Sequence, residues 1–151
     1  MEREEYMALA LELAREAADA GEVPVGAVIA DEHGNIIGRG RNRREERCSA
    51  IHHAEIEAIE EACRAVGDWR LSGCTLYVTL EPCPMCAGAI LNARVPRLVY
   101  GAKEPVTGSC GSVLNLFEER YGFKPAIYGG ILSEECAAVM QEFFAEIRQP
   151  E

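Results

Sequence analysis

The feature that most constrains the fold of this chain is a β-rich segment that leads directly into a turn containing proline and cysteine. Residues 75–80 (TLYVTL) are rich in β-branched, aromatic and aliphatic side chains, which is typical of a buried strand. Pro82 and Pro84 interrupt this pattern. Pro84 suits the first position of a helix, because its missing N–H would have no helical partner there. The sequence therefore predicts a strand over 75–80, a turn, and a helix over 84–93.

The same periodicities predict a mixed α/β fold for the rest of the chain. Apolar residues at helical spacing predict three further helices, over 4–20, 53–66 and 133–147. Segments rich in valine, isoleucine and tyrosine predict four further strands, over 25–30, 36–41, 97–100 and 126–129. The first two of these strands form a hairpin, and a glycine-rich loop is expected over 101–112. A hairpin followed by alternating helices and strands predicts an α/β fold with a mixed sheet between helices.

The composition fits a soluble protein. Hydrophobic residues make up 48% and charged residues 26% of the 151 positions, which are common values for globular proteins. No apolar run approaches the ~20 residues of a membrane-spanning helix, and the charged N-terminus leads into no signal-type segment. We therefore expect one domain over residues 1–151, located in the cytoplasm, with no membrane partner.

Seven cysteines are many for a chain of this length and location. Their odd number, without any sign of export, favours reduced thiols, some of them binding a metal, over a disulfide framework. Cys83 and Cys86 form the one C-x-x-C pair, which by itself is also typical of redox sites and structural zinc knuckles. At a helix start the two sulfurs can point at one spot, and the helix dipole favours the thiolates that a metal requires.

The choice of a third ligand separates a structural from a catalytic metal site. A structural zinc site needs four protein ligands, and the chain has no second C-x-x-C. His53 is the best third ligand, and three ligands with one open position are typical of catalytic zinc. Glu55 is two residues further on. On a helix this spacing turns the two side chains roughly 200° apart, so both reach one site only over the helix N-terminus.

Two short segments combine into a known signature. His53-Ala54-Glu55 and Pro82-Cys83-Pro84-Met85-Cys86 match H-x-E…P-C-x-x-C, which is typical of zinc-dependent base deaminases whose glutamate is the general acid/base. Around these segments the chain resembles the bacterial tRNA-specific adenosine deaminases of the cytidine deaminase-like superfamily. The resemblance covers nearly the whole chain and includes residues 21–28, 42, 75–83, 85–89, 100–102, 111–112, 130–132 and 143–144.

The resemblance implies a fold, a cofactor and an activity. The implied fold is the three-layer α/β/α cytidine deaminase-like fold, with a mixed five-stranded sheet between helices, in a homodimer. The implied hydrolase uses Zn²⁺, held by His53, Cys83 and Cys86, and moves protons through Glu55. Its reaction converts adenosine to inosine at the wobble position of a tRNA anticodon loop, usually that of an arginine tRNA, which is RNA editing as part of tRNA processing.

The resemblance also implies contacts with the substrate. Asn42 would hydrogen-bond the base after it is flipped out of the loop, as base-modifying enzymes require. Val25 and Ala54 would line the pocket for this base. Phe144 and Arg148, on the last helix, would hold neighbouring nucleotides.

The chain departs from the family pattern at three places. It has Ala50-Ile51-His52 where the family usually has Pro-Thr-Ala. Glu104 and Val106 stand where the family usually has an Asp and a Lys near the RNA. Glu104 is therefore expected to face the substrate. Val106 lacks the positive charge of the Lys, so one partner for an RNA phosphate is lost. The net charge of −10 also disfavours a nucleic-acid partner. A cluster of five arginines beside Asn42 favours one. Its members are Arg39, Arg41, Arg43, Arg44 and Arg47.

Two alternative functions remain open from the sequence, and a third fits it poorly. The first is the same chemistry on a free base or nucleoside of the guanine or cytosine type, which the acidic composition would suit. The second is a non-catalytic zinc-binding module, in which Glu55 would have no role in turnover. The third, a thiol–disulfide oxidoreductase built on Cys83 and Cys86, lacks the order of elements of a thioredoxin and leaves His53 and Glu55 unexplained.

Overall fold

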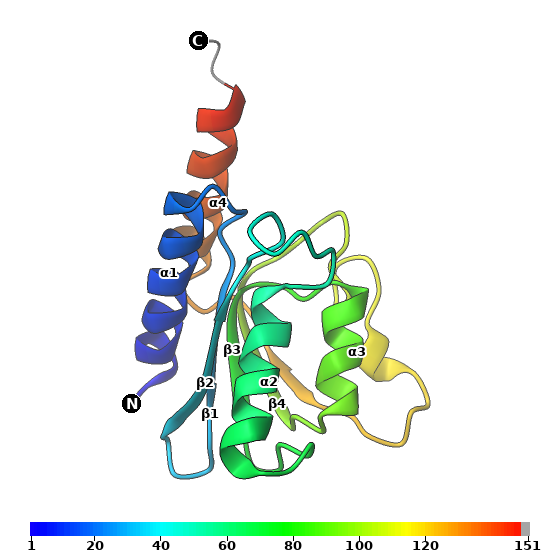
Figure 1. The fold of residues 1–151 in the computed structure, drawn as a ribbon. Coiled ribbons are helices and arrows are strands. Elements are labelled where there is room, and N and C mark those ends of the chain that lie inside the picture. The colour runs from blue at the N-terminus through cyan, green and yellow to red at the C-terminus, as the bar shows by residue number, and fades with distance from the viewer. Residues whose placement is uncertain (149–151) are drawn as a thin grey trace.

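The computed structural model describes residues 1–148, apart from the side chain of Arg148, and is built around one five-stranded sheet (Figure 1). The order of the strands across the sheet is β2-β1-β3-β4-β5. The strands are β1 (Gly26–Ala30), β2 (Ile36–Arg41), β3 (Thr75–Leu80), β4 (Arg97–Ala102) and β5 (Ala126–Tyr128). The helices are α1 (Arg3–Asp19), α2 (Ala54–Val66), α3 (Pro84–Asn92), α4 (Ser133–Arg148) and the short 3-10 helix η1 (Leu116–Glu118).

The sheet is mixed and is covered on both faces. β1 pairs antiparallel with β2 and β3, whereas β3, β4 and β5 run parallel. α2 and α3 pack on one face through a large apolar core, and α1 and α4 pack on the other through a second core (Figure 1). This confirms the predicted three-layer α/β/α fold with a mixed five-stranded sheet between helices.

Every predicted helix and strand is present with its ends within two residues of the prediction, and two differences matter for the fold. β4 extends to Ala102, so Gly101 lies in a strand and not in the predicted loop. A side chain at Gly101 would meet the Cys136 sulfur of α4, which explains a glycine inside a strand. η1 was not predicted. The Asn115 side chain caps it by accepting a hydrogen bond from the Phe117 N–H at 3.1 Å, and the Phe117 side chain is buried in the core. A turn that is stabilised by one cap and one buried side chain has no apolar periodicity from which it could be predicted.

Two glycines of β2 allow α2 to lie unusually close to the sheet. A Cβ atom at Gly38 would meet the Ala58 carbonyl oxygen and would lie 3.0 Å from the Ala62 Cβ. Gly40 is in the same position one turn nearer the start of α2, against the Ala54 carbonyl. The close packing fixes where α2 begins relative to the sheet.

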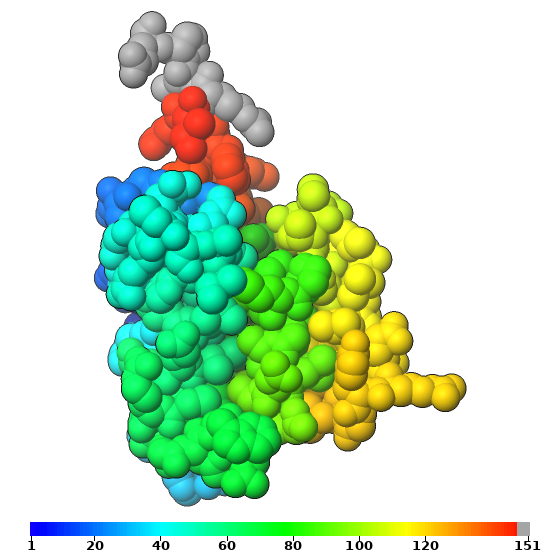
Figure 2. Space-filling model, turned by 45° about the vertical axis from the view of Figure 1, so that its right-hand side comes forward, coloured from blue at the N-terminus to red at the C-terminus, as the bar shows by residue number. Residues whose placement is uncertain are grey.

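Three chain segments reach the same edge of the sheet. β3 ends there at Leu80 and continues through a short turn into α3, and α2 begins there at Ala54 (Figure 1). In open sheets with parallel strands, binding sites form beyond the carboxyl ends of these strands. The C-terminal half of α4 extends past this edge, beyond the rest of the molecule (Figure 1, Figure 2). Within residues 1–148, no helix has the length and apolarity needed to cross a membrane.

Substitution of Gly38 by alanine should test the close packing of α2 on β2. We expect Gly38→Ala to lower the free energy of unfolding by about 1–3 kcal/mol, because the added methyl overpacks a contact between backbone and backbone. Urea denaturation measures this difference. The matched control is Gly88→Ala in α3, where no heavy atom lies within 4 Å of the added methyl and alanine is the better helix former. Equal losses in the two variants would contradict the packing argument.

Candidate metal and substrate site

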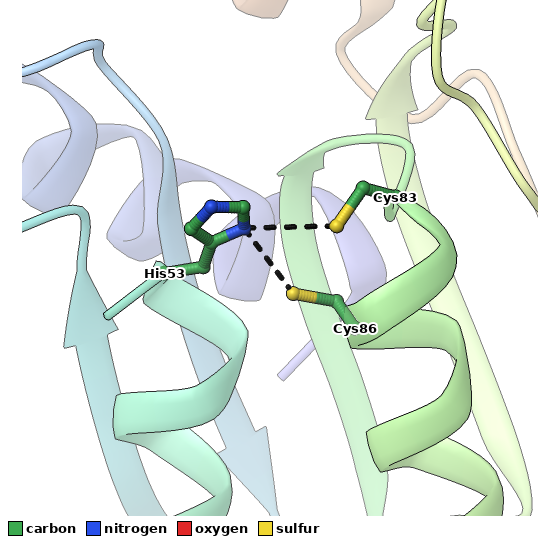
Figure 3. Close-up of side chains that lie close together, drawn as sticks. All are labelled: His53, Cys83 and Cys86. Carbon is green, nitrogen blue, oxygen red and sulfur yellow. Dashed lines mark hydrogen bonds between the residues drawn. The ribbon is translucent and has the colours of Figure 1, made fainter. Parts of the chain in front are cut away.

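Two helix starts bring three metal-ligating side chains together. His53 is the residue before α2, Cys83 is the residue before α3, and Cys86 lies in the first turn of α3. The His53 Nδ1 atom lies 3.7 Å from the Cys83 sulfur and 3.5 Å from the Cys86 sulfur (Figure 3). All three ligand atoms are within 4.8 Å of one another. Pro84 is at the first helical position of α3, where its missing N–H would have no helical partner.

The spacing of these atoms fits a tetrahedral metal ion. Metal–ligand bonds of about 2.0–2.3 Å at tetrahedral angles leave neighbouring ligand atoms roughly 3.5–3.8 Å apart. The two nitrogen–sulfur distances lie in this range. One imidazole and two thiols are ligands that zinc accepts, and they leave the fourth position for another group.

The two sulfurs shift each other's pKa in opposite directions. The hydrogen bond from Cys86 lowers the pKa of the Cys83 thiol to about 4, with smaller contributions from His53. The same hydrogen bond, together with burial, raises the pKa of Cys86. A metal binds cysteine as the thiolate, so binding at this pair would release protons and depend on pH.

Glu55 lies against the metal-ligating group. Its side chain is only 3% exposed. Burial raises the pKa of Glu55 to about 7, against a smaller opposing effect from the nearby His53. Glu55 and His53 line the same cavity, because the site lies over the N-terminus of α2, where residues two apart can both reach it. A carboxyl group with a pKa near neutrality can both accept and release a proton.

A cavity of about 340 Å³ opens above these residues, a volume within the usual range for small-molecule sites. It brings together every residue that the sequence predicted for the site except the fully buried Cys86 and Arg148, whose side chain lies outside the described residues. The predicted residues that line it are Val25, Asn42, His53, Ala54, Glu55, Cys83, Glu104 and Phe144. The lining that the sequence did not predict as site residues includes Val23, Arg44, Leu80, Glu81, Thr107 and Met140.

The orientation of the Asn42 amide is fixed by the backbone. Its Oδ1 accepts a hydrogen bond from the Arg44 N–H at 3.1 Å, and its Nδ2 donates to the Val23 carbonyl at 3.2 Å. An asparagine amide has two N–H groups and an oxygen with two lone pairs. One N–H and one lone pair therefore remain for a ligand in the cavity.

Comparison with known proteins identifies the family. The chain matches the MafB19-like deaminase family over residues 1–148. The chain belongs to this deaminase family. It is 48% identical to a tRNA-specific adenosine deaminase of Bacillus subtilis, over 95% of this chain and 89% of the relative.

Solved structures of deaminases are similar to this protein, which supports its assignment to a deaminase family. One, from studies of A-to-I editing by tRNA:A34 deaminases at the wobble position, superimposes with a TM-score of 0.85 at 44% identity, covering 89% of this chain and 98% of that chain. A guanine deaminase from Nitrosomonas europaea gives a TM-score of 0.82 at 27% identity, covering 94% of this chain and 84% of that chain.

His52 and His53 have separate roles in this deaminase. His53 faces the sulfurs, whereas the His52 Nε2 atom lies 2.7 Å from a carboxylate oxygen of Glu57. The Arg43 guanidinium donates to the same oxygen at 2.7 Å. Arg43 and Arg41 also form ion pairs with Glu46. Two arginines of the basic cluster are thus neutralised within the protein. The sequence did not reveal the Arg43–Glu57 pair, because Glu57 lies on α2.

The Glu57 contacts give the deaminase a pH-dependent contribution to stability. Burial alone raises the pKa of Glu57, but the hydrogen bonds from His52 and Arg43 outweigh it and the pKa is lowered. A lowered pKa stabilises the fold above the unfolded-state value of roughly 4.3, and this stabilisation is lost as the pH falls through the folded-state pKa.

We expect Glu57→Gln to reduce the free energy of unfolding at pH 7 by about 1–2 kcal/mol, because it loses charge-assisted hydrogen bonds. The difference from the wild type should shrink as the pH is lowered below about 4. Denaturation curves across pH 3–8 measure it. The control is Glu60→Gln, one turn along α2, whose exposed carboxylate lies 3.8 Å from Arg64 and should contribute little. A difference that does not change with pH would contradict the assigned pKa direction.

Proposed function

We propose that the chain forms a single zinc-dependent deaminase domain that hydrolyses adenosine to inosine at the wobble position of a tRNA anticodon loop. The observation on which this rests is Glu55, a buried carboxyl group beside three side chains that could hold a metal ion and would leave its fourth position open. A structural metal site would use four protein ligands and would not need a buried acid beside it. The high identity to a tRNA-specific adenosine deaminase supports the choice of substrate.

The chemistry divides between the metal and the protein. Zn²⁺ held by His53, Cys83 and Cys86 would supply a Lewis acid that makes water nucleophilic near neutral pH. Glu55 would accept the proton that water loses on attacking C6 of adenine. It would then return protons to the ring and to the leaving amino group, so that adenosine and water yield inosine and ammonia.

The remaining pocket residues would bind and orient the substrate. Asn42 would hydrogen-bond the flipped base through its free N–H and lone pair, between walls formed by Val25 and Ala54. Phe144 and Arg148 on α4 would hold neighbouring nucleotides. Base flipping costs least in a single-stranded loop, which suits an anticodon.

Glu104 and Arg44 would lie at the edge of the cavity that faces the RNA backbone. The Glu104 carboxylate accepts a hydrogen bond from the Val106 N–H at 2.8 Å, which holds it in its own turn. Arg44 lines the cavity, and among the described residues it forms no ion pair. It would supply a positive charge at the cavity where a backbone phosphate must pass.

We further propose that the deaminase is a cytoplasmic homodimer acting on an arginine tRNA. Exposed apolar side chains on the loops beside the site, Ile51, Val113 and Leu114, support a partner surface. The resemblance in sequence is the basis for the tRNA and for the cellular location.

Deamination of a free base is the second candidate function. The structural similarity to a guanine deaminase and the net charge of −10 favour it. Parallel assays on two substrates separate the candidates. One substrate is an anticodon stem-loop with adenosine at the wobble position, assayed for inosine; the other is a panel of free bases and nucleosides, assayed for ammonia. We expect inosine in the stem-loop alone. Ammonia from a free base without inosine would overturn the tRNA assignment and keep the chemistry.

Substitution of Glu55 by alanine should separate an enzyme from a non-catalytic zinc module. We expect Glu55→Ala to keep the fold and bound zinc and to lose at least about 10²–10⁴-fold in turnover, because the proton carrier is removed. Metal analysis and the stem-loop assay measure the two effects. The matched variant Cys86→Ser should instead lose zinc. Undiminished turnover in Glu55→Ala would rule out the assigned role.

A further inference from the structure

Two fully buried carboxylates take no part in the proposed chemistry. The Glu22 and Glu81 side chains are 1% and 2% exposed. Within residues 1–148 neither forms an ion pair with a lysine, arginine or histidine. A buried carboxylate without a cation is unfavourable unless hydrogen bonds compensate for its lost hydration. The donors that compensate here are backbone N–H groups of two loops.

Glu22 binds the loop that follows β2. One carboxylate oxygen accepts a hydrogen bond from the Glu45 N–H at 3.0 Å, and the other accepts one from the Glu46 N–H at 2.7 Å. The next residue along the chain, Val23, accepts the bond from the Asn42 amide. The segment 22–23 therefore holds this loop at two points, and the loop presents Asn42 and Arg44 to the cavity.

Glu81 binds the loop that follows β4. Its Oε1 accepts from the Glu104 N–H at 3.1 Å and from the Ser112 hydroxyl. Its Oε2 accepts from the N–H groups of Cys110 and Ser112, each at 3.0 Å. The loop curls so tightly around this carboxylate that a Cβ at Gly108 would lie 2.6 Å from Oε2. The loop presents Glu104 and Thr107 to the cavity.

The two loops approach the cavity from different parts of the sheet. Figure 2 shows them as separate cyan and yellow-green regions of the surface, with the green surface near residues 80–90 between them. Neither of the two loop segments that donate hydrogen bonds to these carboxylates is part of a helix or of the main sheet. Their N–H groups lack strand or helix partners, so the two buried side chains fix the geometry that regular structure would otherwise provide.

We propose that Glu22 and Glu81 are positioning residues that hold the two substrate-facing loops in the geometry required for turnover. Each carboxylate offers two oxygens to several backbone donors, and a fully buried anion cannot exchange these donors for water without a large cost. The position of Asn42 and Arg44 thus depends on Glu22, and that of Glu104 and Thr107 on Glu81. The kinetic part of this proposal rests on the proposed function; the structural part does not.

Amide hydrogen exchange of the zinc-loaded protein, followed by NMR, tests the structural part. In the wild type the N–H groups of Glu45, Glu46, Glu104, Cys110 and Ser112 should exchange slowly despite lying in loops. Glu22→Gln should accelerate exchange at the first two alone, and Glu81→Gln at the last three alone. Fast exchange of these amides in the wild type would overturn the proposal, whether or not any variant folds.

Kinetics on the anticodon stem-loop test the functional part. We expect each variant to keep its zinc and to lose about 10- to 100-fold in kcat/KM, largely through KM, since small displacements of binding groups have effects of this size. The control, Glu118→Gln, removes an exposed carboxylate that pairs with Lys124 and should leave both rates and loop exchange unchanged. Loosened loops with wild-type kinetics would reduce both residues to a purely structural role.

Milder substitutions keep the test informative if the glutamine variants fail to fold. Glu22→Asp shortens the side chain by one methylene, and Ser112→Ala removes one of the four hydrogen bonds to Glu81. Both should accelerate amide exchange and raise KM, as the glutamine variants do, but by smaller amounts.

Loss of zinc from Glu81→Gln would overturn the proposal for Glu81, because that residue would then act through the Cys83 turn. If the wild type deaminates no RNA, the proposed function fails while the exchange data still decide the loop contacts.

Discussion

The site depends on two helix N-termini that meet at one edge of the sheet. α2 begins after His53 and α3 begins after Cys83, and the positive ends of both helices point toward the same small volume. The electrostatic field of these two helix ends favours anionic groups, including cysteine thiolates. Glu55 experiences the opposite influence, because its burial disfavours the anion and raises its pKa. One place in the fold therefore favours thiolates as possible ligands of a cation and raises the pKa of a neighbouring carboxyl group toward neutrality.

Rigid and irregular parts of the chain contribute differently to the site. The metal-ligating residues belong to helix starts that the apolar cores hold in place, with α2 fixed by the close packing of Gly38 and Gly40. The proposed substrate contacts come partly from helices, as with Ala54 and Phe144, and partly from loops, where hydrogen bonds to buried carboxylates replace apolar packing. Loops vary more easily than cores, so a common catalytic centre can serve different bases by changes in these loops. The similarity of the fold to both an RNA-editing and a guanine-deaminating protein accords with this division.

The sequence was most informative where function depends on short spacings. The spacing of Cys83 and Cys86 predicts two sulfurs at one helix start, His53 and Glu55 were proposed from the signature that they form with this pair, and the strands and helices followed from their periodicity. The contacts of Glu22 with residues 45 and 46, and of Glu81 with residues 104–112, join segments more than 20 residues apart. No local pattern encodes such contacts. Thr107 and Met140 reach the cavity only because the topology brings a loop and α4 to the same edge.

The ion pairs of the basic loop change what its charge can do. Of the five arginines between positions 39 and 47, Arg41 and Arg43 are bound to Glu46 and Glu57, so within the described residues three remain without an ion pair. Affinity for a polyanion falls with salt in proportion to the counterions that its phosphates release. The loop therefore contributes the counterion release of about three cations at most, so its attraction to a polyanion is weaker, and depends less steeply on salt, than the arginine count implies. An acidic protein with such a loop relies more on the shape of its pocket than on long-range attraction to find its substrate.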